Sequence, residues 1–224
     1  MRSLLAIMAL MLTMLSGPAW AGEGAARLVA AQSRTDEAYG PFRVIDATRA
    51  ALDGVTDARS PAQFAAMLRD HPGLALLEMR DCPGTEDDLA NLRLGRMIRA
   101  AGLQTHVPDG GSVRSGAVEL FLAGVSRRID DGAEFAVHAW LDESGLQAGD
   151  FSANAPENRR YLAFYREMGM AEDEATAFYA MTNSVPFSEA RWLSAQDMRQ
   201  WVKADRSQQA APMLAYLDLG PLLH

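Results

Sequence analysis

Hydrophobic positions in the first two thirds of the chain form short runs that alternate between the period of a strand and the period of a helix. The strand-like runs cover residues 42–46, 51–55, 74–79, 103–107 and 135–138. Helix-like runs separate them, at residues 60–70, 86–101 and 115–124. Strands and helices that alternate at such short intervals predict a layered α/β fold with mostly parallel strands.

Local signals place the ends of these elements. Ser60 is expected to be the N-cap of the helix that Pro61 begins, and the apolar run at 74–79 indicates a strand buried on both faces. The helix at 86–101 has an acidic start and a basic later part, which suits the helix dipole. The residues of that helix expected to face the sheet are Leu89, Leu92, Met97 and Ile98.

The last third of the chain has helical periodicity. Residues 158–168 and 172–181 have aromatic side chains at helical spacing, a pattern more typical of core or subunit interface than of a ligand site. Ser194 is expected to cap a further helix, and the pattern becomes irregular from Trp201 onward. The domain therefore has a helical C-terminal part.

The N-terminus has the three parts of a secretory signal. Arg2 is followed by an apolar run at residues 4–15 and by Ala19-Trp20-Ala21, an A-x-A cleavage site. That run is shorter than the roughly 20 residues of a membrane helix, which disfavours the alternative of an uncleaved anchor. We expect a signal peptide at 1–21, a mobile lead-in at 22–40, a single domain at 41–224, and a periplasmic or secreted protein without a stable membrane span.

Composition excludes several functional classes. The net charge of −8 leaves no basic surface for nucleic acid, so no nucleic-acid partner is expected. Cys82 is the single cysteine, which rules out an intrachain disulfide. The four histidines are dispersed, and the sequence contains no P-loop, no G-x-G-x-x-G after a strand and no H-E-x-x-H. We therefore expect neither a metal nor another cofactor.

Candidate chemistry is concentrated between Gly110 and Trp140. Two glycines lead to Ser115, an apolar helix-like run follows it, and the next strand ends at His138. A hydroxyl at the start of a buried helix and an imidazole on the following strand are the groups that nucleophilic acyl transfer requires. Neither Ser112 nor Ser115 fits the G-x-S-x-G pattern of an α/β-hydrolase.

The order of these motifs resembles the proteolytic subunit of Clp protease and its relatives in the Clp/crotonase superfamily, including enzymes similar to signal peptide peptidase A. That family's S-P-G-G after an apolar strand is similar to Cys82-Pro83-Gly84-Thr85, and its serine with small followers is similar to Ser115-Gly116-Ala117. Its helix-closing A-G pair with a basic residue is similar to Ala123-Gly124 and Arg127-Arg128, and its I/V-H strand end to Val137-His138. Its F-L-S-A-x-E-A block is similar to residues 192–197, so the resemblance covers roughly residues 42–203.

The resemblance implies roles for particular residues. Ser115 would be the nucleophile, His138 the general base, and the amides of Gly116 and of the Gly84-Thr85 turn an oxyanion hole. It also implies repeated ββα units, a peptide or protein substrate, and a possible homo-oligomer. The positive end of a helix that begins near Ser115 would favour the developing negative charge.

Two positions depart from the family pattern. The third triad position falls on Ala190, so the adjacent carboxylate of Glu189, a backbone carbonyl or water, or less favourably Asn183, would have to orient the imidazole. Thr85 replaces a glycine, and β-branched residues resist positive φ.

Other interpretations of the same residues are open. Ser115 could be only a helix N-cap and His138 only a histidine bonded at a strand end. The domain could then be a catalytically lapsed Clp-like module that binds peptides or assembles with partners. Acyl-thioester chemistry of the crotonase type is disfavoured, because export separates the protein from coenzyme A.

Overall fold

The computed structural model describes residues 37–206. The expected signal peptide and its cleavage site lie outside these residues, as do most of the expected lead-in and the last 18 positions of the expected domain. Within the described range, no helix combines the length and apolar character needed to cross a membrane.

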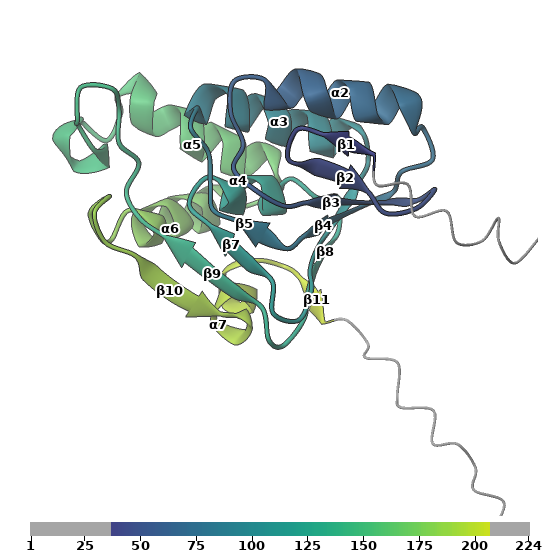
Figure 1. The fold of residues 1–224 in the computed structure, drawn as a ribbon. Helices are drawn as coiled ribbons and strands as arrows, with labels where there is room; N and C mark the ends of the chain where they lie inside the picture. The colour runs from purple at the N-terminus through teal and green to yellow at the C-terminus, as the bar shows by residue number, and fades with distance from the viewer. Residues whose placement is uncertain (1–36, 207–224) are drawn as a thin grey trace, which may run out of the picture. The chain divides into compact units, whose positions relative to one another are not determined.

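The larger of two sheets has seven strands in the order β1-β2-β3-β4-β6-β8-β11 (Figure 1). Their bounds are β1 Ala38–Tyr39, β2 Phe42–Val44, β3 Arg49–Leu52, β4 Leu76–Met79, β6 Gln104–Val107, β8 Arg127–Ile129 and β11 Asp205–Arg206. β1, β2 and β3 pair antiparallel, and every pairing from β3 to β11 is parallel.

The smaller sheet has four strands in the order β10-β9-β7-β5. Their bounds are β5 Asp81–Cys82, β7 Ser112–Arg114, β9 Glu134–Val137 and β10 Arg191–Ser194. β5, β7 and β9 are parallel, and β10 pairs antiparallel with β9.

The chain alternates between the two sheets. In the larger sheet, β4 is followed along the chain by β5 of the smaller sheet, β6 by β7, and β8 by β9. A helix follows each of the first two pairs. These helices are α3 (Asp88–Ala100) and α4 (Ala117–Leu122). The predicted α/β fold of repeated ββα units with mostly parallel strands is therefore confirmed.

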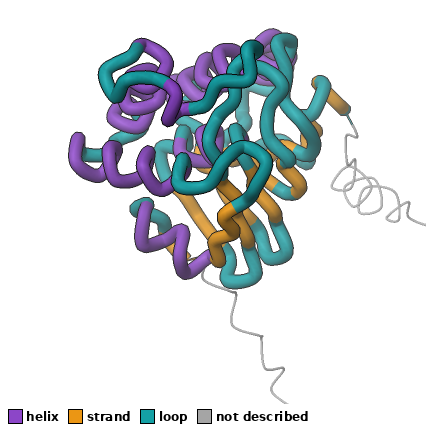
Figure 2. Tube along the Cα trace, turned by 90° about the vertical axis from the view of Figure 1, so that its left-hand side faces the viewer, coloured by secondary structure: helices purple, strands orange, loops and turns teal. Residues whose placement is uncertain are grey.

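Helices surround this framework (Figures 1 and 2). The others are α2 Ser60–Asp70, α5 Pro156–Glu167, α6 Glu172–Thr182 and α7 Ala195–Trp201, with a short 3-10 turn at Ala148–Asp150. All six residues of α4 are buried, so this helix lies inside the domain rather than on its surface. The helices after residue 155 confirm the expected helical C-terminal part.

Six short strands were not predicted, namely β1, β5, β7, β8, β10 and β11, and three of them lie in the ββα units. β5, β7 and β8 have only two or three residues each, and polar side chains such as Asp81, Arg114 and Arg128 interrupt their hydrophobic pattern. Backbone pairing with a parallel neighbour holds them, and a period-2 pattern needs more residues than these strands provide.

The expected inner face of α3 was partly wrong. Leu92 and Ile98 are buried and Met97 is partly buried, but Leu89 is 63% exposed and Leu94 is fully buried in its place. The helix begins only at Asp88, so Leu89 lies in its first turn, beyond the layer that the later turns cover.

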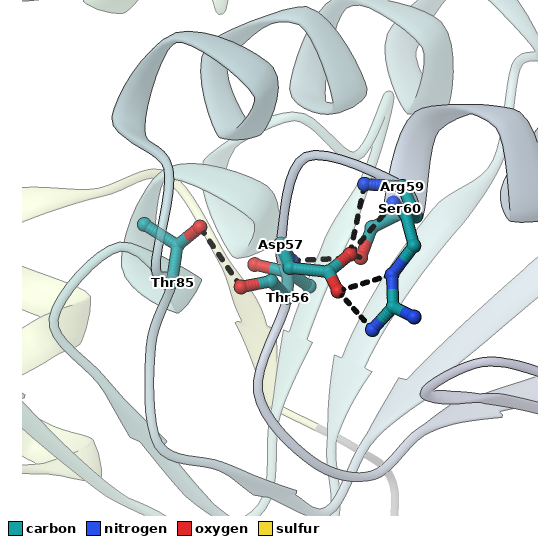
Figure 3. Close-up of polar contacts among 5 residues, drawn as sticks. All are labelled: Thr56, Asp57, Arg59, Ser60 and Thr85. Atoms are coloured by element: carbon teal, nitrogen blue, oxygen red, sulfur yellow. Dashed lines mark hydrogen bonds and ion pairs between the residues drawn. The ribbon is translucent and has the colours of Figure 1, made fainter.

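The expected N-cap of α2 was also wrong. Ser60 is already helical, and the Asp57 carboxylate accepts hydrogen bonds from the backbone N–H groups of Arg59 and Ser60 (Figure 3). A carboxylate satisfies the free N–H groups of a helix start as a capping hydroxyl does. The expected capping role of Ser194 is confirmed, because its Oγ accepts a hydrogen bond from Asp197 N–H.

The first hairpin begins inside the expected lead-in. Ala38 pairs with Arg43 and Tyr39 with Phe42, and Gly40 turns the chain with a φ of +63°. The sheet therefore starts before residue 41, because the small polar residues that suggested a lead-in continue into this edge strand.

Candidate active site

Ser115 lies at the turn between β7 and α4. Its φ is +50°, and it is the one non-glycine residue with positive φ in residues 37–206. Two backbone hydrogen bonds hold it there: its N–H donates to Ala136 at 2.8 Å, and its carbonyl accepts from Val118 at 2.9 Å. A left-handed conformation costs an L-residue about 1–2 kcal/mol, and such strain is typical of functional sites.

The interpretation of Ser115 as a helix N-cap is wrong. The N-cap of α4 is Gly116, and no side chain caps that helix. The reason is geometric, because the left-handed backbone of Ser115 places the residue one position before the helix start. Its hydroxyl is therefore not used by the helix.

Gly84 lies directly against Ser115. Its φ is +134°, and a Cβ added to Gly84 would lie 2.9 Å from the Cβ and 3.3 Å from the Oγ of Ser115. The family resemblance implied an oxyanion-hole turn at this glycine. The structure shows that the turn and the serine meet only because residue 84 has no side chain.

Replacing Gly84 with alanine should damage the site more than the fold. The new methyl group would meet Ser115 and would force a left-handed backbone on alanine, at a cost of about 1–3 kcal/mol. We expect urea unfolding to show a free energy of unfolding that is lower by that amount. Any activity that depends on Ser115 should fall by more than about tenfold. Gly110→Ala is the matched control, because its φ is also positive but its added Cβ meets nothing within 4 Å.

The turn that follows Gly84 is tied to the β3–α2 connection. Thr85 Oγ1 donates to the carbonyl of buried Thr56 at 3.2 Å (Figure 3), and Thr56 N–H donates to the Gly84 carbonyl at 3.0 Å. Thr85 needs no positive φ, so its β-branched side chain fits the turn. Its Cγ2 occupies the space beside Gly116, where an added Cβ would lie only 2.6 Å away.

Buried Asn91 links this turn to the serine turn. Its Nδ2 donates to the Gly116 carbonyl at 2.6 Å, and its Oδ1 accepts from Thr56 Oγ1 at 3.0 Å. The N–H groups of Thr85 and Gly116 donate no hydrogen bond within the described part of the chain. Two free amides in a fixed frame beside a serine have the composition of an oxyanion hole.

His138 directly follows β9. Its Nδ1 lies 2.9 Å from the Ala139 carbonyl, and its ring meets that of Phe187 edge to face, with centroids 4.8 Å apart. A carbonyl only accepts, so the neutral ring has its proton on Nδ1 and the lone pair on Nε2. This is the tautomer that a general base requires.

Ser115 and His138 line the same cavity, which has a volume of about 510 Å³. Among the described residues, no hydrogen bond joins the serine hydroxyl to the imidazole. Hydrogen bonds between catalytic groups are often long before a substrate binds. The cavity also has Thr85, Gly116 and Asn183 on its wall, and the partly exposed apolar side chains Leu89, Leu141 and Phe187.

The expected third member is not brought to the site. Glu189 is exposed, does not line the cavity and has no side-chain hydrogen bond to another described residue, and Ala190 is exposed as well. Asn183 does line the cavity, and its buried Oδ1 has no partner within residues 37–206. The Ala139 carbonyl is the group that holds the imidazole.

Sequence reasoning missed a buried carboxyl group in this cavity. Glu119 lies in α4, only 7% exposed, and accepts a hydrogen bond from the Tyr165 hydroxyl at 2.7 Å. Burial raises the pKa of the Glu119 carboxyl to about 7, against the lowering effect of the Tyr165 bond. The available signal was a single acid inside an otherwise apolar helix.

Comparisons with known proteins give distant similarity. No family model matches the chain, and no curated protein matches it. Two solved structures of mutants of the 1510-N membrane-bound stomatin-specific protease, one with a substrate peptide, are each 13% identical. They have TM-scores of 0.45 and 0.48, over 68% and 71% of this chain and 73% and 77% of theirs.

A structure of a ClpP1 mutant from Listeria monocytogenes is 12% identical, with a TM-score of 0.49 over 72% of this chain and 91% of that chain. Similarities of this size assign neither an activity nor a substrate to the present chain.

Proposed function

We propose that this protein is an exported serine hydrolase, a peptidase that acts through an acyl-enzyme on Ser115. The observation that carries the proposal is the strained turn between β7 and α4, which presents the hydroxyl of Ser115 at a cavity that His138 also lines. Strain of about 1–2 kcal/mol at a serine that caps no helix is explained by a role in chemistry. The proposed location in the periplasm or outside the cell is supported by the signal-like residues 1–21.

The residues define a balanced reaction. Ser115 Oγ attacks the carbonyl carbon of the scissile amide, and its proton passes to Nε2 of His138. The N–H groups of Gly116 and Thr85 donate to the oxyanion that forms. When the oxyanion collapses, the C–N bond breaks and His138 gives its proton to the leaving amine. A water molecule then hydrolyses the Ser115 ester by the same steps.

The mouth of the cavity supports a peptide substrate. Leu89, Leu141 and Phe187 are all at least 37% exposed there. Exposed apolar side chains grouped around a polar cavity are typical of surfaces that bind peptides or proteins. The proposed substrate is therefore a peptide or protein, and assembly into a homo-oligomer is compatible with it.

A fluorophosphonate probe tests the chemistry. Purified wild-type protein should be modified at Ser115, and mass spectrometry of the intact chain would also report whether the N-terminus begins at Gly22. His138→Ala should slow the modification by at least about 100-fold, because it removes the base. Ser144→Ala, an exposed serine outside the cavity, is the control and should label like wild type.

The second candidate is a catalytically lapsed module that binds peptides. It is favoured because no carboxylate among the described residues forms a hydrogen bond with His138, and because Glu189 is exposed. This candidate would be supported, and the first contradicted, if the probe never modified the native protein. The same conclusion would follow if the probe modified a residue other than Ser115 and the rate were the same in wild type and in His138→Ala.

A further inference from the structure

The inner wall of the cavity contains the carboxyl group of Glu119. This residue lies in α4, the helix that follows the Ser115 turn, and both Glu119 and Ser115 line the cavity. The five other residues of α4 are hydrophobic and buried. Glu119 is therefore the one ionisable group that this helix contributes.

No cation neutralises Glu119 in the part of the chain that the structure describes. Its Oε1 accepts from the Tyr165 hydroxyl, and the backbone N–H of Glu119 itself also donates to the carboxyl group; no other described residue donates to it. A side chain that is 7% exposed in such surroundings is costly to ionise unless a partner of opposite charge arrives. A cationic donor beside this carboxyl would stabilise its ionised form.

Other carboxylates line the same cavity. Besides Glu119, its carboxylates are Glu86, Asp87, Asp88, Asp142 and Glu143, and Arg160 is its one arginine. None of the six forms an ion pair within residues 37–206, and Asp88 accepts a hydrogen bond only from Tyr161, at 2.7 Å. Carboxylates of one sign around a concave surface attract cations and repel anions.

Arg160 does not occupy the place beside Glu119. Its guanidinium lies 5.9 Å from the centre of the Trp140 ring, and its Nε donates to the Glu157 carbonyl at 3.0 Å. Trp140 in turn lies parallel to Tyr161, with an interplanar angle of 13°. Aromatic rings beside carboxylates provide a wall along which the methylene chain of a long basic side chain can pack.

We propose that Glu119 determines specificity by binding the cationic end of a lysine or arginine side chain next to the scissile bond. This inference rests on the proposed peptidase function. The cavity of about 510 Å³ can hold a side chain of that length together with the adjoining backbone. Tyr165 and the backbone N–H of Glu119 already donate to this carboxylate, so it is better suited to one further charge-assisted bond, as from the ammonium group of lysine, than to a bidentate guanidinium.

Paired covalent probes test the assignment. Two peptidyl diphenyl phosphonates would be compared, one with lysine and one with norleucine beside the phosphorus, since norleucine keeps most of the methylene chain and lacks the charge. Wild-type protein should react at least about tenfold faster with the lysine probe. Glu119→Gln should lower the lysine rate by about tenfold or more and leave the norleucine rate within about threefold.

Glutamine at residue 119 keeps the oxygen that accepts from Tyr165, so the variant should fold. Asp173→Asn removes one exposed charge from the first turn of α6, away from the cavity lining, and should change neither rate. Equal rates with both probes in wild type, or equal losses in Glu119→Gln, would overturn the assignment and leave the peptidase proposal intact.

Binding of Nα-acetyl-lysine amide, which carries the ammonium group of lysine, separates the two proposals. If no phosphonate or fluorophosphonate reacts, this compound is titrated by calorimetry into wild-type, Glu119→Gln and Asp173→Asn protein. Binding to wild type and Asp173→Asn that is lost in Glu119→Gln would uphold the cation site and contradict only the peptidase function. Absence of binding to wild type, or binding unchanged by Glu119→Gln, would overturn the cation site.

Discussion

Ser115→Ala should abolish modification by fluorophosphonates and lower peptide hydrolysis by at least about 1000-fold, because it removes the nucleophile and leaves only binding and the oxyanion hole. Its stability should change by less than about 1 kcal/mol. The hydroxyl caps no helix, and alanine inherits the same φ of +50°. Peptide hydrolysis would be followed with the same purified protein that is used for urea unfolding.

Ser115→Gly should lose the same activity and become more stable. Glycine adopts a left-handed backbone without the clash that a Cβ causes, so relief of strain should stabilise the fold by about 1 kcal/mol relative to Ser115→Ala. A glycine variant no more stable than the alanine variant would mean that the turn stores no strain. Residual hydrolysis in both variants would assign the activity to another residue.

The layered fold could be predicted from the sequence because each ββα unit begins with a strong signal. The apolar run at 74–79 and the helical pattern after Thr85 are each unambiguous, and they correspond to β4 and α3 in the structure. The smaller sheet could not be predicted in full. β5 and β7 are two or three residues long, and their existence depends on pairing with each other through Asp81 and Ser112.

Much of the candidate site could also be predicted from the sequence, because its two main residues lie at the ends of predicted elements. Ser115 follows a glycine turn and precedes a helix, and His138 ends the next predicted strand, so topology alone brings both to one end of neighbouring strands, β7 and β9. The strain at Ser115 was not accessible, because a positive φ follows from how β7, α4 and Gly84 pack together.

The support for His138 was predicted only as one of several alternatives. The family pattern places the orienting carboxylate at residue 190, which is alanine here, and the adjacent Glu189 was one possible replacement. The chain instead places Glu189 on the surface and the Ala139 carbonyl beside the imidazole. A backbone carbonyl fixes the tautomer as a carboxylate does. It contributes less to the stability of the imidazolium that forms during catalysis, since it has no full charge. The proposed peptidase should therefore be slow.

Glu119→Gln should change the pH dependence of stability. Burial raises the pKa of this carboxyl to about 7 from its usual value of 4.5, against the Tyr165 hydrogen bond, and the nearby charge of Asp88 adds to the rise. The folded protein then holds a proton on Glu119 that the unfolded chain has already lost above its own pKa. The stabilising contribution is present in full below about pH 4.5 and is lost as the pH rises through 7.

The size of the loss follows from the difference of about 2.5 pKa units between the two states, which corresponds to about 3 kcal/mol. Glutamine is neutral at every pH and keeps an acceptor for Tyr165, so the variant should escape this loss. The free energy of unfolding would be measured in urea at about pH 5 and about pH 8.5. Between these two pH values, the difference between variant and wild type should shift by about 2–3 kcal/mol in favour of the variant. All other ionisable groups are shared by the two proteins, so the double difference reports on Glu119 alone. A difference that stays constant with pH would mean that the carboxyl is ionised in the folded protein at neutral pH, already paired with a cation.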